Sequence, residues 1–422
     1  MTVPASPEQP TGTPTRGPAW SPWRVVVMFG VTSLAADLVY EGARSVYGPL
    51  LASLGASALV VGLVTGAGEG TALLLRLLVG PWSDRTGRYW AATISGYALT
   101  VVSVPLLAVT PFLGAAGLTV AAVLILLERT GKAVRSPAKT ALLAQFAAQV
   151  GRGRGFGVHK AMDQTGAFLG PLLVAAVVAV TGALWTGLAV LAVPGVATMV
   201  VLLATRAGAP RPDAEGHHQD AVPPGTPTVP GWWAQVRGAG LPPAFFWYAA
   251  AASLVTGGLV TFGLIGYHLT VTGLATEALV PVVYAAGMLA EAVGALVVGW
   301  LYDRSGPTVL YAVPALVAVV PALALGGRLW VALLGVLVWG LAFGLQDSTV
   351  KALVAEIVAA PRRATAYGVF AAFQGAAAVA GGALAGWLYE RSLTSLVVVV
   401  AASQLLAAVL LARALRLLPA AG

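Results

Sequence analysis

Apolar runs long enough to cross a lipid bilayer recur along almost the whole chain, separated by short polar connections. A spanning helix needs about 20 mostly apolar residues, whereas a spanning β-strand has about ten residues of alternating polarity. The runs are too long and too uniformly apolar for strands, so the sequence predicts an all-α membrane protein. We expect twelve transmembrane helices, at residues 24–52, 58–80, 89–109, 113–140, 154–180, 184–205, 244–271, 277–301, 308–325, 329–356, 364–388 and 394–415.

The composition excludes several classes of protein. Charged residues make up 9% of the chain, against about 25% in soluble domains, which leaves no room for a sizeable soluble domain. The net charge of +8 does not indicate a nucleic-acid partner, because the basic residues lie singly at the ends of apolar runs. The absence of cysteine excludes thiolate catalysis and thiolate metal sites, and no phosphate-binding Gly-x-x-x-x-Gly-Lys-Ser/Thr loop occurs. No metal or cofactor is predicted.

Arginine in the connections predicts the orientation. Fourteen arginines fall in one alternate set of loops and tails, whereas the other set holds only Arg328 and Arg391. The positive-inside rule then places both termini and the long central connection in the cytoplasm, which indicates a multi-pass protein of the cytoplasmic membrane.

Two charged turns reveal an internal repeat. "GPWSDRTGRYW" at residues 80–90 shares its skeleton with "GWLYDRSGPTV" at residues 299–309. Six spans separate the copies, so both halves enter the membrane in the same orientation and form a parallel repeat about a pseudo-two-fold axis along the membrane normal. The predicted organisation is a disordered tail at 1–22, a six-helix bundle at 23–205, a cytoplasmic linker at 206–243 and a second six-helix bundle at 244–422.

On these residues the chain resembles the major facilitator superfamily, whose signature after the second span is approximately G-x-x-x-D-R-x-G-R. "GPWSDRTGR" matches it, with Pro81, Trp82 and Tyr89 departing from the usual residues. Two weaker matches follow. "RTGKAVRSP" at 129–137 resembles the fourth-span arginine motif, and "GAFLGP" at 166–171 resembles a fifth-span motif of drug antiporters, although plain helix packing also explains that spacing. The resemblance implies a central path lined by the first, fourth, seventh and tenth spans.

The two turns are candidate conformational latches. The resemblance implies that Asp84 meets the start of the eleventh span and, by symmetry, that Asp303 meets the start of the fifth. Such contacts would hold the cytoplasmic side closed in the outward-facing state. The alternative is a compact, positively charged loop with no further role. The latch candidates are Gly80, Asp84, Arg85, Gly87, Arg88, Asp303, Arg304, Gly306, Arg152, Arg154, Arg362 and Arg363.

Ionisable residues within the spans are functional candidates, because each costs on the order of 2.5–3.5 kcal/mol to insert. They either line a cavity or form structural ion pairs, such as Glu41 with Arg44 or Asp163 with Lys160. The candidates for proton coupling or for the substrate cavity are Asp37, Glu41, Arg44, Glu69, Arg76, Arg129, Lys132, Arg135, His159, Lys160, Asp163, Glu291, Asp347 and Lys351. Glu128 and Lys139 share the fourth-span stripe.

Asp37, Glu41 and Glu69 lie far from the expected interfaces. Because desolvation and a neighbouring arginine act in opposite directions on a carboxylate, opening and closing a cavity can load and unload a proton. We hypothesise proton coupling through Glu41 or Glu69, with Arg44 or Arg76 as the modulating cation. The predicted function is export of a small molecule by proton antiport, by a monomer whose partners are its substrate, protons and the bilayer. The alternatives are a proton-coupled uptake symporter of a small organic or anionic solute, a polytopic membrane enzyme, and a non-transporting sensor.

Overall fold

The computed structural model describes residues 20–210, 240–359 and 362–417, with the side chains of residues 349–352, 355 and 364 outside the description. Within these ranges the chain forms helices and no strand, as predicted. Eleven helical stretches are long and apolar enough to cross a membrane, and one of them, 279–324, joins two predicted spans. Most of the predicted tail and linker lies outside the described residues.

With the stretch 279–324 counted as two, the described residues of each half contain six spans. The first half consists of α1 (Pro22–Arg44), α2 (Tyr47–Ser53), α3 (Ala58–Thr86), α4 (Tyr89–Leu106), η1 (Leu107–Phe112), η2 (Gly114–Ala116), α5 (Gly117–Val150), α6 (Arg152–Thr181), α7 (Leu184–Ala189) and α8 (Ala192–Gly208). The second half consists of α10 (Pro243–Gly258), α11 (Phe262–Val271), α12 (Leu279–Ser305), η4 (Gly306–Tyr311), α13 (Ala312–Ala324), α14 (Leu329–Ile357), α15 (Arg363–Arg391) and α16 (Leu393–Arg416).

The first span of each half is broken, where the sequence predicted one continuous helix. In the first half, α1 ends at Arg44 and the Ser45 hydroxyl donates a 2.6 Å hydrogen bond back to the Gly42 carbonyl. In the second half, α10 ends at Gly258 and the Thr261 side chain accepts a hydrogen bond from a backbone amide to start α11. The two breaks occur in the first span of each repeat, and each divides its span into a longer helix and a shorter helix.

The charged motifs belong to helices rather than to connections, so the predicted helix ends at residues 80 and 301 are too early. Helix α3 continues through Thr86 and stops at Gly87, whose φ of 63° lies in the left-handed region. Helix α12 continues to Ser305 and stops at Gly306, with φ of 64°. Charged residues in a last helical turn resemble a loop in sequence although they are compatible with a helix, and a glycine with positive φ follows each last turn.

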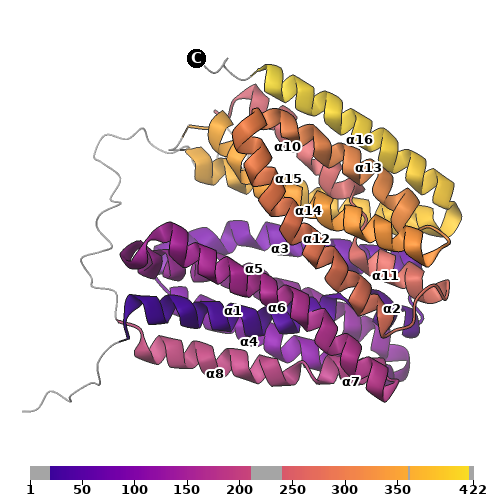
Figure 1. Ribbon diagram of the computed structural model, residues 1–422, viewed down its shortest axis with the longest axis horizontal. Coiled ribbons are helices and arrows are strands. Elements are labelled where there is room, and N and C mark those ends of the chain that lie inside the picture. Colours follow the sequence, from indigo (N-terminus) through magenta and orange to yellow (C-terminus); the bar gives the residue numbers. More distant parts are fainter. Residues whose placement is uncertain (1–19, 211–239, 360–361, 418–422) are drawn as a thin grey trace, which may run out of the picture.

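The two ends of the bundle differ in how tightly the halves meet. We call the end where α1 and α10 begin the linker end, and the end where α2 and α11 finish the far end. The Trp20 backbone amide bonds to the Gly208 carbonyl at 2.9 Å, so the first half starts and finishes side by side at the linker end. Figure 1 shows the halves diverging toward that end and converging toward the far end.

Glycines close the far end. A Cβ added at Gly62 on α3 would collide with the Gly382 carbonyl on α15, and a Cβ at Gly382 would collide with the Gly62 carbonyl. Likewise, a Cβ at Gly48 on α2 would collide with the backbone of α11 at Gly263. Small residues allow helix backbones to approach this closely, and packing attraction then holds the helices together. The Thr65 and Thr261 hydroxyls add a 2.8 Å hydrogen bond between the halves.

Candidate functional site

A buried network of charges joins α1, α3 and α5 within the first half. The Arg44 guanidinium donates a 2.7 Å hydrogen bond to the Glu69 carboxylate and lies 3.7 Å from that of Glu41. The Arg129 guanidinium lies 3.4 Å from Glu69 and 3.4 Å from Glu128, whose side chain is fully buried. Two arginines therefore form ion pairs with three carboxylates. The predicted pairing of Glu41 with Arg44 is present, and Glu69 holds two helices to a third.

Three tyrosines complete this network, and sequence reasoning missed all of them. The Tyr40 hydroxyl accepts a hydrogen bond from Arg129, and the Tyr47 hydroxyl donates one to Glu128 at 3.3 Å. Tyr284 on α12 belongs to the other half and donates a 2.5 Å hydrogen bond to the Glu41 carboxylate. A tyrosine inside an apolar run carries no charge signal, so only the fold reveals its partner. Through Tyr284, the network spans both halves.

A second polar cluster lies between α1, α5 and α6. The Asp163 carboxylate is 3.4 Å from the Lys160 ammonium, as predicted, and 3.9 Å from that of Lys139. Lys139 also donates a 2.8 Å hydrogen bond to the Ser33 hydroxyl, which lies 3.0 Å from His159 Nε2. The Asp37 carboxyl lies within electrostatic reach of Asp163 and Lys139. Two acidic and two basic side chains thus share one site.

The remaining predicted cations of the first half lack a carboxylate within 4 Å among the described residues. The Lys132 ammonium lies 3.7 Å above the Tyr40 ring. The Arg135 guanidinium donates a 2.7 Å hydrogen bond to the Thr100 hydroxyl and is buried between α4 and α5. Arg76 lies near Glu69, and its Nε is buried without a hydrogen-bond partner. These side chains leave the first half with more positive than negative charge.

The second half contributes carboxylates instead. Glu291 on α12 lies within electrostatic reach of Glu41, Arg44 and Lys160 across the interface, and of Asp347 on α14. Among the described residues, neither Glu291 nor Asp347 has a cation within 4 Å. The Lys351 backbone belongs to α14, but its side chain lies outside the described residues.

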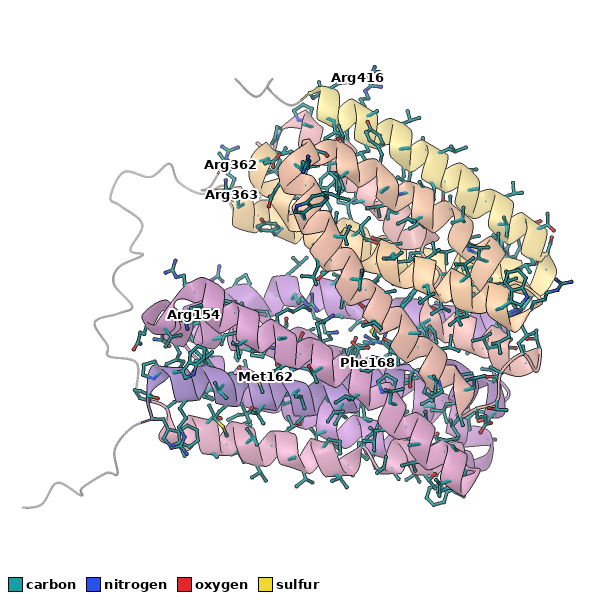
Figure 2. The ribbon with its side chains drawn as sticks, viewed as in Figure 1. Arg154, Met162, Phe168, Arg362, Arg363 and Arg416 are labelled. Atoms are coloured by element: carbon teal, nitrogen blue, oxygen red, sulfur yellow. The ribbon has the colours of Figure 1, made fainter. Side chains whose placement is uncertain are left out.

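The latch candidates gather at the linker end, on both halves. The Asp84 carboxylate accepts a 3.1 Å hydrogen bond from the Tyr89 hydroxyl, and no ion pair between described residues involves Asp84 or Asp303. Arg362 donates to the Gly240 carbonyl, and Arg363 donates to the Val358 carbonyl just after α14. The exposed candidates at this end include Arg85, Arg88, Arg152, Arg154 and Arg304, while Gly80 lies in open space. Figure 2 places Arg154 and the Arg362–Arg363 pair on different halves at the same end.

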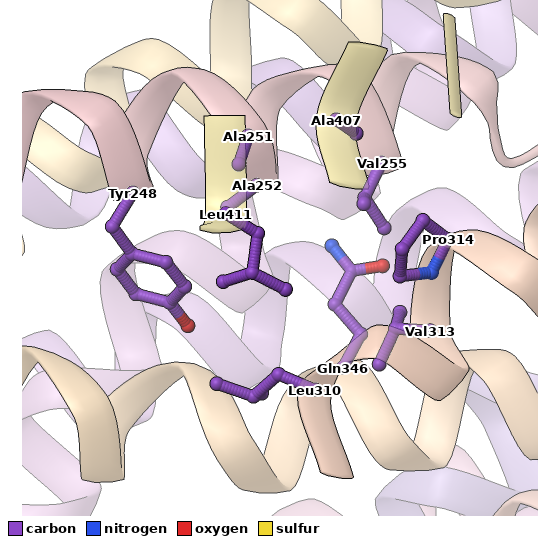
Figure 3. A pocket seen from close by; sticks show the side chains of 10 residues that line it. All are labelled: Tyr248, Ala251, Ala252, Val255, Leu310, Val313, Pro314, Gln346, Ala407 and Leu411. Carbon is purple, nitrogen blue, oxygen red and sulfur yellow. The ribbon is translucent and has the colours of Figure 1, made fainter. Parts of the chain in front are cut away.

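A small cavity of about 30 Å³ lies inside the second half, away from these charges. Its walls come from α10, α13, α14 and α16 and from η4, and Figure 3 shows Gln346 as the one amide among mostly apolar side chains. The Gln346 Nε2 donates a 2.6 Å hydrogen bond to Thr256, whereas its Oε1 is buried without a partner. Its lining includes none of the charged residues of the two clusters.

The fold and its charged interface define a secondary transporter. A family model of the Major Facilitator Superfamily matches residues 29–354 and 275–422, so the chain belongs to this family of multi-pass membrane transporters and is not an enzyme. The chain is 50% identical over 395 residues to an uncharacterized protein of Mycobacterium tuberculosis strain H37Rv, covering 93% of each protein. It is also 30% identical over 149 residues, or 35% of its length and 36% of the relative's, to an uncharacterized MFS-type transporter of Methanocaldococcus jannaschii.

Solved structures share the fold. A mutant of the nucleoside transporter NupG superposes with a TM-score of 0.72 at 13% identity, covering 92% of this chain and 99% of that one. A mutant of the peptide transporter POT in complex with sulfate gives a TM-score of 0.71 at 18% identity, covering 93% and 94%. Identities this low identify the fold alone.

Proposed function

We propose that this transporter exports a small molecule across the cytoplasmic membrane in exchange for protons, by alternating access. The observation that carries the proposal is the asymmetry of the two ends. Glycine contacts and the Thr65–Thr261 hydrogen bond hold the halves together at the far end. At the linker end, Asp84 and Asp303 have no ion pair among the described residues. We interpret this arrangement as the state open at the linker end.

The distribution of arginine supports a cytoplasmic linker end. The connections and helix starts there carry most of the arginines outside the spans, whereas Arg328 and Arg391 lie at the far end. Under the positive-inside rule the described state is inward-facing. In the outward-facing state the halves would close at the linker end, and Asp84 and Asp303 would meet the arginines at the starts of α15 and α6.

Glu41 is the residue we propose for proton coupling. Its carboxylate receives Tyr284 from the opposite half and lies 3.7 Å from Arg44, which is itself bonded to Glu69. When the far end opens, Tyr284 withdraws and the surroundings of Glu41 change. A proton can then bind from one side of the membrane and leave on the other. The Glu69 carboxylate forms ion pairs with two arginines, and we propose that it stabilises the packing of the helices in the first half.

Export is the direction we propose because "GAFLGP" at 166–171 resembles the fifth-span motif of drug antiporters. In the structure, Gly166 and Gly170 of this motif pack against the backbone of α1 at Leu34 and Leu38. They therefore fix the position of α6 beside the Asp37–Asp163 site.

Growth of a deletion strain on a panel of toxic compounds and nutrients selects candidate substrates. Each candidate is then tested in proteoliposomes that contain the full chain, by counterflow and by a pH-sensitive dye trapped inside. Proton antiport predicts that an imposed pH gradient drives the substrate against its own gradient and that substrate flux moves protons in the opposite direction. Proton movement in the same direction as the substrate would establish the symporter instead. A rate of substrate exchange that does not change with the pH gradient would contradict proton coupling.

A further inference from the structure

The charges that face each other across the two halves point to the chemical class of the substrate, an inference that rests on the proposed transport function. Among the described side chains at the core of the first half, cations outnumber carboxylates. The cations are Arg44, Arg76, Arg129, Lys132, Arg135, Lys139 and Lys160, and the carboxylates are Asp37, Glu41, Glu69, Glu128 and Asp163. The two clusters together hold five carboxylates and four cations, and the three further cations Arg76, Lys132 and Arg135 make the total charge of these side chains positive.

Lys132 is the excess cation best placed to meet a ligand. Its ammonium lies against the Tyr40 ring and has no carboxylate within 4 Å among the described residues. Lys132 also lies within electrostatic reach of Asp37 and Glu69, the acidic residues of both clusters. Arg135, by contrast, is 4% exposed and bonded to Thr100, so it serves the packing of α4 on α5.

The facing half carries the opposite charge. Glu291 is partly buried and Asp347 is exposed, and neither has an ion pair among the described residues. Both lie within reach of Lys160, whose side chain is 58% exposed and extends from α6 toward the interface. A carboxylate inside a membrane protein is costly unless a cation or a proton neutralises it. Among the described side chains no cation lies within 4 Å of either carboxylate, so we take the ligand as the source of the positive charge.

We propose that the substrate is a small zwitterion, whose anionic group binds at Lys132 and whose ammonium group binds at Glu291 and Asp347. An anion alone would leave the two carboxylates of the second half without an ion pair, and a cation alone would leave Lys132 without one. One molecule that carries both charges bridges the halves. It therefore stabilises them close together, as required of a substrate that triggers the change of state.

A matched series of ligands tests this assignment on the purified full chain in detergent. Glycine, 4-aminobutyrate and 6-aminohexanoate vary the distance between the two charges, leucine adds an apolar side chain at the charge separation of glycine, and O-phosphoethanolamine replaces carboxylate by phosphate. Each amino acid is compared with its N-acetyl and its carboxamide derivative, which remove one charge at a time. Binding is measured by calorimetry and by the shift in thermal unfolding. We expect at least one zwitterion to bind about tenfold more tightly than either of its blocked forms, since a charged hydrogen bond is lost each time.

Amino-acid variants test which residues of the protein bind each charged end of the ligand. In Glu291→Gln and in Asp347→Asn, the preference for the zwitterion over its N-acetyl form should fall, while its preference over the carboxamide persists. Lys132→Gln should show the reverse pattern. Glu356→Gln is the matched control, because this carboxylate is also on α14 but already accepts a 2.8 Å hydrogen bond from Tyr302. Asp347→Glu keeps the charge and should restore the preference.

Three results would overturn the assignment. The first is that no zwitterion of the series binds, and the second is that blocked forms bind as tightly as the free ones. The third is that Glu291→Gln and Asp347→Asn both leave the preference unchanged, as expected if these carboxylates carry protons instead. Because binding is measured without a membrane gradient, a zwitterion that binds but is not exchanged in counterflow would contradict the transport proposal and leave this inference standing.

Discussion

The Tyr284 hydroxyl of the second half donates a 2.5 Å hydrogen bond to the Glu41 carboxylate of the first half. Both side chains are buried, and Glu41 also lies 3.7 Å from Arg44. The contact therefore connects the position of the two halves to the charge network that holds α1, α3 and α5 together.

Glu41→Gln should abolish the response of transport to a pH gradient while leaving exchange of substrate without a gradient intact. The amide keeps a hydrogen-bond acceptor for Tyr284 but cannot carry a proton. The measurement compares gradient-driven flux with counterflow in proteoliposomes. Glu356→Gln, at an exposed position, is the control. A Glu41→Gln protein that still concentrates substrate with the pH gradient would exclude Glu41 as the coupling residue.

Tyr284→Phe should make the far end open more readily, because the variant loses a hydrogen bond to a charged group, worth about 1.5–3 kcal/mol. The open population at the far end should rise by about tenfold or more. Spin labels on the far-end tips of α2 and α11 report the distance between the halves. Tyr302→Phe, which removes a hydroxyl within the second half alone, should leave that distance distribution unchanged.

Because the chain has no cysteine, a single pair of introduced cysteines can test alternating access. Thr65 and Thr261 lie on opposite halves with their hydroxyls 2.8 Å apart. Thr65→Cys with Thr261→Cys should form a disulfide under mild oxidation and stop transport, with activity restored by a reductant. Each single variant serves as the control. Full transport with the crosslink in place would mean that the far end does not open during the cycle.

Asp84→Asn should slow transport by about tenfold without weakening substrate binding. The described state has no ion pair at Asp84, so the substitution removes a contact that forms only after the linker end closes. Transport rates in proteoliposomes and binding in detergent separate the two effects. Equal losses of both would assign Asp84 to the substrate site.

Glu69→Gln should destabilise the protein by about 3 kcal/mol, because it leaves Arg44 and Arg129 without the carboxylate that they share. Thermal unfolding in detergent, followed by light scattering and tryptophan fluorescence, measures the loss. The Lys160–Asp163 pair offers a comparison, since Lys160 is exposed and Lys160→Gln should change the unfolding temperature little. An unchanged stability in Glu69→Gln would show that the network has no structural role.

The sequence predicted the number and order of the spans because each is a long apolar run, and it predicted the Glu41–Arg44 and Lys160–Asp163 pairs because their spacing places both members on one helix face. It did not predict the breaks after Arg44 and Gly258. Pro49 has no backbone N–H to donate to the Ser45 carbonyl, a local signal for the first break that our prediction did not use, whereas residues 259–261 of the second break contain no proline. The Tyr284–Glu41 contact joins residues 243 positions apart, and no local pattern contains such a pair.

The contacts that close the two ends of this transporter, here called its seals, are of different physical kinds. At the far end, backbone meets backbone at Gly62 and Gly382, a contact without charge that salt leaves untouched. At the linker end, the proposed seal consists of exposed charges such as Asp84 and Arg362, whose attraction falls off within about 8 Å at physiological ionic strength. The balance between the two states therefore depends on the salt concentration of one compartment only. With the linker end in the cytoplasm, as we propose, a cell that concentrates its cytoplasm would shift this protein toward the inward-facing form, and its transport rate would depend on its osmotic history.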